Sequence, residues 1–377
     1  MSLTHSESAK WLDRALRVAA STAYRRHPIF ARLKAADAAS ATTFAAIHGL
    51  LAKEGLLSHP KDYTTLIAIL GKGGAWREAV ASLSLMRQSA LEPSVTTFTA
   101  CMSACSNAMQ ADQALGLFWA LPEHGIEPNV VAYSVAITAC ERGRRWECGI
   151  GLLACMRRHG VEATSVTYGA LVSALAKCGQ WAGAMHLLAE MRPNDVLPNV
   201  IVYNATINAA EKGRQWELAI SLFDGMESDR IQADVFSFSS VISACEKGRQ
   251  WFRALGFLQE MLARGLEANL VTFSSAIAAC SRGSQWPRAL QMFEELPGRR
   301  LAPDIVAHNI AIGACEEGWR WERALSLFGD VRGRHWTPTL VTFNTTLSAC
   351  CKAGAWAPAL GLLEAMRAQR LRADARA

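Results

Sequence analysis

The chain has 377 residues, of which 51% are hydrophobic and 19% are charged, a composition typical of a folded protein with a core. It contains no run of 18 apolar residues, which excludes a membrane-spanning helix. The net charge is +6, and +4 of that lies in residues 1–40. The rest of the chain carries only +2, too little to support nucleic-acid binding by bulk charge alone.

The N-terminal 40 residues differ in composition from the rest. Five arginines stand among Ala and Ser in this segment, a pattern typical of an organellar transit peptide, although Glu7 and Asp13 weigh against it. We therefore expect residues 1–40 to be a transit peptide or a disordered leader. No apolar signal-peptide core is present, so secretion is not expected. Residues 41–59 are predicted to form a helical cap on the segment that follows.

A repeat of 35 residues governs the remainder of the chain. Six cysteines are separated by multiples of 35, and we interpret them as reduced thiols at one core position. Eight tryptophans share the same period, and Ala111 occupies the one empty place between them. The cysteines are Cys105, Cys140, Cys245, Cys280, Cys315 and Cys350, and the tryptophans are Trp76, Trp146, Trp181, Trp216, Trp251, Trp286, Trp321 and Trp356.

Residues 60–374 divide into nine units without insertion, and only residues 375–377 follow them. We number positions 1 to 35 within each unit. The units are 60–94, 95–129, 130–164, 165–199, 200–234, 235–269, 270–304, 305–339 and 340–374.

Each unit is predicted to form two helices. Position 4 is aromatic in eight units and His308 in the other, and apolar residues follow at the spacing of one helix face. Gly is common at position 14, which predicts the end of the first helix, and Trp at position 17 opens a second apolar stripe. We assign that Trp to the core rather than to a stacking surface. Because one helix pair cannot bury its stripes alone, the pairs should stack into a solenoid, treated as one array.

The unit 200–234 resembles the pentatricopeptide repeat (PPR). Its opening Tyr203–Asn204 pair, its Lys212–Gly213 turn, its Glu-x-Ala-x-x-Leu-Phe second helix and its final Asp234 carry the resemblance. The likeness extends over 315 of the 377 residues, whereas a tetratricopeptide repeat would have a 34-residue period. It departs from the common pattern at position 17, where Trp replaces Leu. The resemblance implies an all-α, right-handed superhelical solenoid of nine helix-turn-helix repeats, a P-type array without a C-terminal catalytic domain.

PPR proteins bind single-stranded RNA, one base per repeat. The resemblance implies that the base is read by the residues at positions 5 and 35, and here all of these are short and polar except Gly169. The pairs are Thr64 with Ser94, Thr99 with Asn129, Ser134 with Thr164, Gly169 with Asn199, Asn204 with Asp234, Ser239 with Asn269, Ser274 with Asp304, Asn309 with Thr339, and Asn344 with Asp374.

In the family's code, a small hydroxyl residue with Asn resembles an adenine reader and with Asp a guanine reader, while Asn with Asp resembles a uracil reader. Carried over, these pairs predict the target 5′-nAnnUAGnU-3′, in which n marks the first, third, fourth and eighth repeats.

Two further positions favour RNA as the ligand. The resemblance implies that position 2 wedges the base between repeats, and in seven units this residue is apolar: Val131, Val166, Ile201, Phe236, Val271, Val306 and Val341. Position 13 is cationic in seven units, which predicts a track for the RNA backbone, with Asn107 and Glu317 as exceptions. The cations are Lys72, Arg142, Lys177, Lys212, Lys247, Arg282 and Lys352.

No catalytic or metal-binding pattern is present. The nine histidines lack metal or triad spacing, and neither a phosphate-binding loop nor a zinc-deaminase signature occurs. We expect a binding protein with no cofactor, no metal and no appended enzyme domain. Its predicted role is sequence-specific RNA binding in processing, stability, editing or translation in a mitochondrion or chloroplast, with a recruited RNA-processing enzyme as a possible partner and no membrane. The alternative is a tetratricopeptide-like scaffold for protein interactions.

Overall fold

The computed structural model describes residues 48, 51, 57, 59–333 and 336–368. The predicted leader, nearly all of the predicted cap, Asp374 and the last three residues lie outside these ranges. The described part of the chain consists of α-helices and short 3-10 turns, with no strand. None of its helices is long and apolar enough to cross a membrane.

Every repeat forms the two helices that the sequence predicts. The first helix begins at position 1 in all nine repeats, and the second begins at position 17. The first helices are α4 (Pro60–Lys72), α6 (Val95–Asn107), α8 (Val130–Gly143), α10 (Ser165–Lys177), α12 (Val200–Lys212), α14 (Val235–Lys247), α16 (Leu270–Arg282), α18 (Ile305–Glu317) and α20 (Leu340–Lys352).

The second helices are more variable in length. Three of them are shortened and continue into 3-10 turns, namely η2 (Pro122–His124), η3 (Arg192–Asn194) and η4 (Pro297–Arg299). The second helices are α5 (Trp76–Gln88), α7 (Ala111–Trp119), α9 (Trp146–Arg158), α11 (Trp181–Met191), α13 (Trp216–Ser228), α15 (Trp251–Ala263), α17 (Trp286–Glu295), α19 (Trp321–Gly333) and α21 (Trp356–Ala368).

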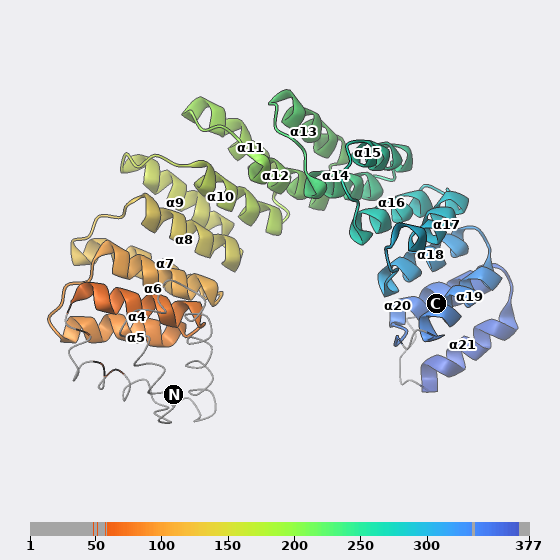
Figure 1. Ribbon diagram of the computed structural model, residues 1–377, viewed down its shortest axis with the longest axis horizontal. Coiled ribbons are helices and arrows are strands. Elements are labelled where there is room, and N and C mark those ends of the chain that lie inside the picture. The colour runs from red at the N-terminus through yellow and green to blue at the C-terminus, as the bar shows by residue number, and fades with distance from the viewer. Residues whose placement is uncertain (1–47, 49–50, 52–56, 58, 334–335, 369–377) are drawn as a thin grey trace. The chain divides into compact units, whose positions relative to one another are not determined.

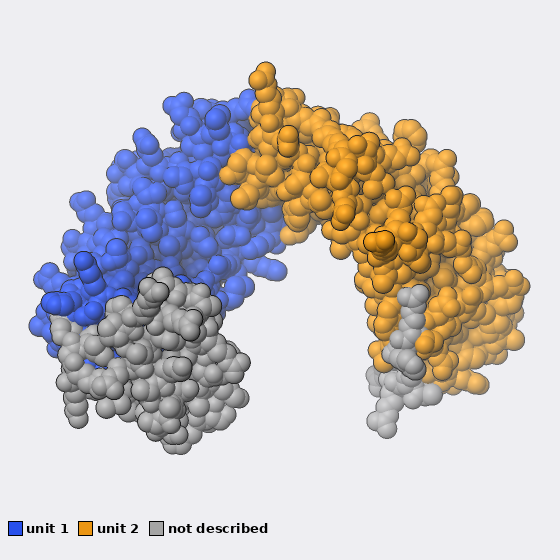
Figure 2. All heavy atoms as spheres, viewed as in Figure 1, with its two compact units in different colours: residues 1–198 blue, residues 199–377 orange. Residues whose placement is uncertain are grey.

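The chain divides into two compact units, residues 1–198 and 199–377 (Figure 2). The first unit holds the helices of repeats one to four and the second holds those of repeats five to nine, whereas we expected a single undivided array. Within each unit, every first helix packs against the first helix of the next repeat and against its own second helix (Figure 1). Each unit is therefore a stack of helix pairs in two layers, and the handedness of the superhelix stays a prediction.

The core consists of the residues that recur every 35 positions. All nine residues at position 4 are buried, and so are the six cysteines at position 11. Burial raises the pKa of the Cys105 thiol to about 11 and that of Cys140 to about 12, so both are protonated at neutral pH. The interpretation of these cysteines as unpaired core residues is confirmed.

The glycine at position 14 ends the first helix, as predicted, and it also has a packing role that the sequence did not indicate. Gly248 is the C-cap of α14 with a φ of −81°, and the left-handed residue is the next one, Arg249, at +56°. A Cβ on Gly248 would lie 2.4 Å from the ring of Trp216 in the preceding repeat. Gly283 and Gly318 meet Trp251 and Trp286 in the same way. Position 14 is therefore small because the tryptophan of the preceding repeat packs against it.

Trp216, Trp251 and Trp286 lie at these contacts between repeats, whereas Trp181 and Trp356 are exposed, so the assignment of the tryptophans to the core is confirmed only in part. Trp216 and Trp251 are partly buried, and each is also covered by an arginine of the next repeat. The guanidinium carbon of Arg253 lies 5.3 Å from the ring centroid of Trp216, and that of Arg288 lies 5.1 Å from that of Trp251. Cation–π geometry of this kind adds to the packing between successive repeats.

We predict that Gly248→Ala destabilises the second unit by about 1–3 kcal/mol, because the added methyl group overpacks the contact with Trp216. The measurement is the midpoint of urea unfolding. The matched control is Gly256→Ala in α15, where a Cβ would meet nothing within 4 Å. This control should stabilise the protein by up to about 1 kcal/mol through helix propensity. Equal effects of the two substitutions would contradict the proposed packing role.

Candidate nucleic-acid interface

The residue at position 35 caps the first helix of the next repeat. Its side chain accepts a hydrogen bond from the backbone N–H of position 3, as when Asp234 Oδ1 accepts from the Ser237 amide at 2.8 Å. An N-cap satisfies one of the N–H groups that have no partner within the helix. The same capping occurs at Ser94, Asn129, Thr164, Asn199, Asp234, Asn269, Asp304 and Thr339.

This capping role was missed in the sequence analysis. There, the short polar residues at position 35 were attributed to base reading alone. The signal was present, since Ser, Thr, Asp or Asn directly before an apolar-periodic helix is the usual mark of an N-cap. Helix capping is therefore sufficient to explain a polar residue at position 35, but it does not explain the polar residues at position 5.

The structure brings the fifth and last residues of several repeats together. In the fifth repeat, the Asn204 amide donates a hydrogen bond to Asp234 Oδ1 at 3.1 Å. The Ser237 hydroxyl, at position 3 of the next repeat, donates to Asn204 Oδ1 at 2.6 Å and to Asp234 Oδ1 at 2.9 Å. The two predicted reading residues and this serine thus form a closed hydrogen-bonded group.

A hydroxyl at position 3 links two other pairs in the same way. Thr97 bonds to Thr64 at 3.0 Å and to Ser94 at 3.1 Å. Thr272 bonds to Ser239 at 2.6 Å and to Asn269 at 3.1 Å. Position 3 was not singled out in the sequence, although its hydroxyl residues could be found by aligning the repeats.

The hydrogen bonds around Asp234 determine its charge. Partial burial would by itself raise the pKa of this carboxyl group. The amide and hydroxyl of Ser237 and the amide of Asn204 donate to it, however, and together they hold its pKa below the usual value for Asp. Asp234 is therefore an anionic acceptor at neutral pH.

The remaining pairs lack such a link among the described residues. Thr99 and Ser134 donate to backbone carbonyls of their own helices, and Ser274 is buried. Asn309 and Asn344 each have a buried side-chain oxygen with no hydrogen-bond partner among the described residues. Gly169 is buried and offers no side chain, and Asp374, the partner of Asn344, lies outside the described residues.

Two grooves between successive first helices are lined by several of the predicted site residues. A groove of about 360 Å³ in the first unit follows α6, α8 and α10, and one of about 610 Å³ in the second unit follows α12, α14 and α16. The first is lined by Val131, Ser134, Arg142, Thr164 and Val166 among others, and the second by Asp234, Phe236, Ser239, Asn269 and Val271 among others.

Each groove is lined by a polar pair together with two apolar side chains. Ser134 and Thr164 line the first groove with Val131 and Val166, which stand at position 2 of successive repeats. All seven apolar residues at position 2 are exposed, Val166 by 67% and the much larger Phe236 by 52%. One exposed apolar side chain therefore recurs at the same place in seven successive first helices.

The cations at position 13 lie at the end of the first helices, but most of them are paired. Lys177, Lys247, Arg282 and Lys352 each form an ion pair with a glutamate at position 12 of the preceding repeat. Arg142 instead donates a hydrogen bond to the side-chain oxygen of Asn107. Lys212 is exposed and has no acidic partner among the described residues, and Lys72 ends α4.

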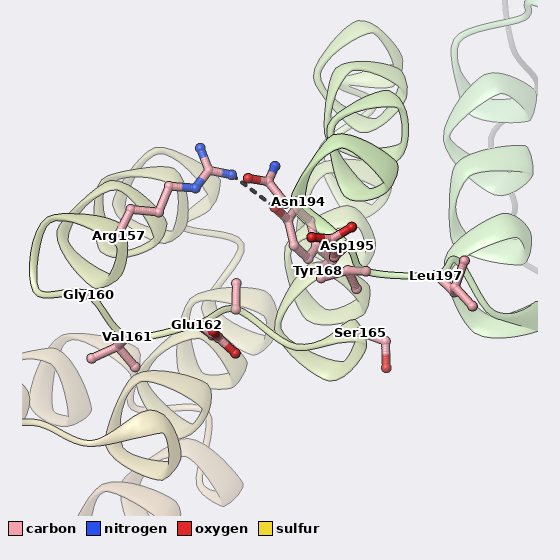
Figure 3. Close-up of a pocket in the computed structure, with 11 residues that line it drawn as sticks. Arg157, Gly160, Val161, Glu162, Ser165, Tyr168, Asn194, Asp195 and Leu197 are labelled. Carbon is pink, nitrogen blue, oxygen red and sulfur yellow. Dashed lines mark hydrogen bonds between the residues drawn. The ribbon is translucent and has the colours of Figure 1, made fainter.

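One further cavity lies away from the predicted residues. It has a volume of about 730 Å³ and lies beside the loops that follow α9 and α11 (Figure 3). Arg157 enters it, but its guanidinium donates to the Tyr168 hydroxyl at 2.9 Å and pairs with Glu190. Because its one arginine is already neutralised, this cavity offers no unpaired cation to a ligand.

The described residues include no arrangement suited to a metal ion. No group of three or more His, Cys, Asp or Glu residues is arranged there to hold a metal ion. His308 is buried between the rings of Phe293 and Trp336, and its Nδ1 lies 2.8 Å from the Asp304 carbonyl oxygen. It therefore occupies the core position that is aromatic in the other eight repeats.

Comparison with protein-family models identifies the repeats. Models of the PPR repeat family match residues 163–209 and 198–247, and models of the pentatricopeptide repeat domain match residues 55–108, 85–142 and 256–317. A third model of the PPR repeat matches residues 131–161, 236–266 and 341–371. Together these matches cover well over half of the sequence. The chain belongs to the pentatricopeptide repeat family.

Solved structures show the same fold. The pentatricopeptide repeat protein PPR10, in a crystal structure with an 18-nt psaJ RNA element, matches with a TM-score of 0.64 and 21% identity over 99% of this chain. A crystal structure of PPR10 from maize matches with a TM-score of 0.52 and 20% identity over 96% of the chain. The chain spans 59% and 62% of the length of these two structures. No curated protein sequence matches it significantly.

We predict that the PPR helices depend on their caps. Asp304→Ala should weaken the first turn of α18 by about 1 kcal/mol, because the Ala307 amide loses its acceptor at 2.8 Å. Asp304→Asn should preserve the cap, as Asn does at three other repeats. Native-state hydrogen exchange of the first turn of α18 measures the difference. Equal protection in the Ala variant and the parent protein would contradict the capping role.

Proposed function

We propose that this PPR array binds single-stranded RNA and places one base in each groove between successive first helices. The observation that carries the proposal is the composition of the grooves, which are lined by the polar residues of positions 5 and 35 together with exposed apolar residues of position 2. A base has two apolar faces and a polar edge. Such a groove fits it, because the apolar side chains contact the faces and the polar pair meets the edge.

The pairs differ from repeat to repeat, which supports sequence-specific binding. Asn204 with Asp234 suits uracil, Ser239 with Asn269 suits adenine, and Ser274 with Asp304 suits guanine in the family's code. With Thr99 and Asn129 at the second repeat and Asn344 and Asp374 at the ninth, the proposed target is 5′-nAnnUAGnU-3′. The PPR10 complex with an 18-nt RNA supports RNA as the ligand class.

The protein would act as a binder rather than as an enzyme. By covering about nine nucleotides it could block a nuclease, open a hairpin or recruit a processing or editing enzyme. The arginine-rich residues 1–40 and the family relationship support a site of action in a mitochondrion or chloroplast. Imaging the full chain fused to a fluorescent protein tests that location, and a purely cytosolic signal would contradict it.

Selection of the purified full chain against a random single-stranded RNA pool tests the proposal. Enrichment of a motif containing A-n-n-U-A-G-n-U supports both the ligand and the register. Enrichment of an unrelated motif would retain RNA binding and reject the base assignments. No retention at low salt, where phosphate contacts are strongest, would reject RNA binding and favour a protein-interaction scaffold.

We predict that Asn204→Thr shifts the base preference of the fifth repeat from U towards G, because the pair then becomes a hydroxyl residue with Asp. Binding to RNAs that differ only at that nucleotide measures the shift. Ser239→Thr is the matched control, since it exchanges one hydroxyl residue for another in the next repeat and should leave the preference for A unchanged. An unaltered preference in the Asn204→Thr variant would show that the register or the base assignment is wrong.

A further inference from the structure

The cations at position 13 fall into two groups, according to the residue at position 12 of the preceding repeat. Where that residue is Glu, the cation is paired with it. The N–O distances are 3.0 Å for Lys177 with Glu141, 2.9 Å for Lys247 with Glu211, 3.2 Å for Arg282 with Glu246 and 2.9 Å for Lys352 with Glu316.

The four carboxylates are held in place. Their side chains are between 13% and 22% exposed, far less than the typical surface carboxylate. A serine at position 9 of the next repeat provides a second donor in two cases. Ser243 donates to Glu211 at 2.7 Å, and Ser348 donates to Glu316 at 2.6 Å. Glu211 and Glu316 are thereby each held against the cation by two donors.

Two cations do not have such a partner. Position 12 of the second repeat is Ser106, and Arg142 in the next repeat donates to the neutral side chain of Asn107 and has no acidic partner in the described part of the chain. Position 12 of the fourth repeat is Ala176, and Lys212 is exposed without an acidic partner among the described residues. Arg142 also lines the groove of the first unit, next to the predicted base-reading residues.

We infer that position 12 of one repeat decides whether the cation at position 13 of the next repeat can hold an RNA phosphate. Arg142 and Lys212 then contact RNA phosphates, whereas the four cations that are paired with Glu form neutral ion pairs that link successive repeats. This inference rests on the proposed RNA binding.

The physical basis is the balance of charge near the phosphate. A phosphate that contacts Lys247 also comes close to the carboxylate of Glu211, so attraction and repulsion largely cancel. Only uncompensated cations release counterions from the RNA, and each one steepens the dependence of log Kobs on log salt by about 0.7 for a single strand. The same row of seven cations therefore gives far fewer phosphate contacts than its number suggests.

The test measures the salt dependence of binding to a labelled single-stranded RNA containing UAUUUAGUU, using the full chain. Glu211→Gln should free Lys247, steepen the slope by about 0.7 and tighten binding about threefold at low salt. Gln retains the shape of Glu and can still accept from Ser243. Glu260→Gln in α15 is the matched control, because it removes the same charge from an exposed pair with Arg264 outside the groove.

A second pair of variants tests the converse. Lys212→Gln should make the slope shallower by about 0.7, whereas the double variant Glu211→Gln/Lys247→Gln, which removes both partners of a neutral pair, should leave it nearly unchanged. Equal losses in these two variants would overturn the inference, and so would equal gains in Glu211→Gln and Glu260→Gln. Failure of the unaltered chain to bind this RNA or a random pool at low salt would instead reject the proposed function itself. Urea unfolding of each variant verifies that the fold is retained.

Discussion

The stack of the second unit depends on the close approach of a tryptophan at position 17 to the glycine at position 14 of the next repeat, as at Trp216, Trp251 and Trp286. At Trp216 and Gly248 there is no space for even one methyl group between the ring and the backbone. This contact sets the spacing between successive helix pairs. Within each unit the first helices lie side by side and form a groove, along α6, α8 and α10 in the first unit and along α12, α14 and α16 in the second, so the proposed ligand surface follows from the packing.

The residues that line this surface also serve the fold. Asp234 caps α14, accepts from Asn204 and remains ionised because those donors hold its pKa low. The cap fixes the orientation of a side chain that is proposed to read a base, so recognition needs little rearrangement. Position 13 also contributes to the fold, since Lys247 links two repeats through its ion pair with Glu211. Position 2 is the exception, since an exposed Val or Phe contributes little to packing and is best explained by a ligand.

The residues at which the helices begin could be predicted because the same residue pattern recurs every 35 positions along the chain. Tyr203, Trp216 and Asn204 each recur in kind at the same position of other repeats. The packing role of Gly248 could not be predicted, because the Trp216 ring that contacts it lies 32 residues earlier in the sequence. The neutralisation of Lys247 was missed for the same reason, since Glu211 lies in the preceding repeat. The division after residue 198 has no counterpart in the regular 35-residue pattern.

The central claim is that successive repeats contact successive nucleotides. It is tested most directly by photo-crosslinking, with 4-thiouridine placed at each position in turn of the RNA 5′-UAUUUAGUU-3′ and the crosslinked peptides identified by mass spectrometry. The account predicts that each step of one nucleotide towards the 3′ end moves the crosslink 35 residues towards the C-terminus, always to a first helix. Crosslinks that stay at one repeat, or that fall on the second helices, would contradict it.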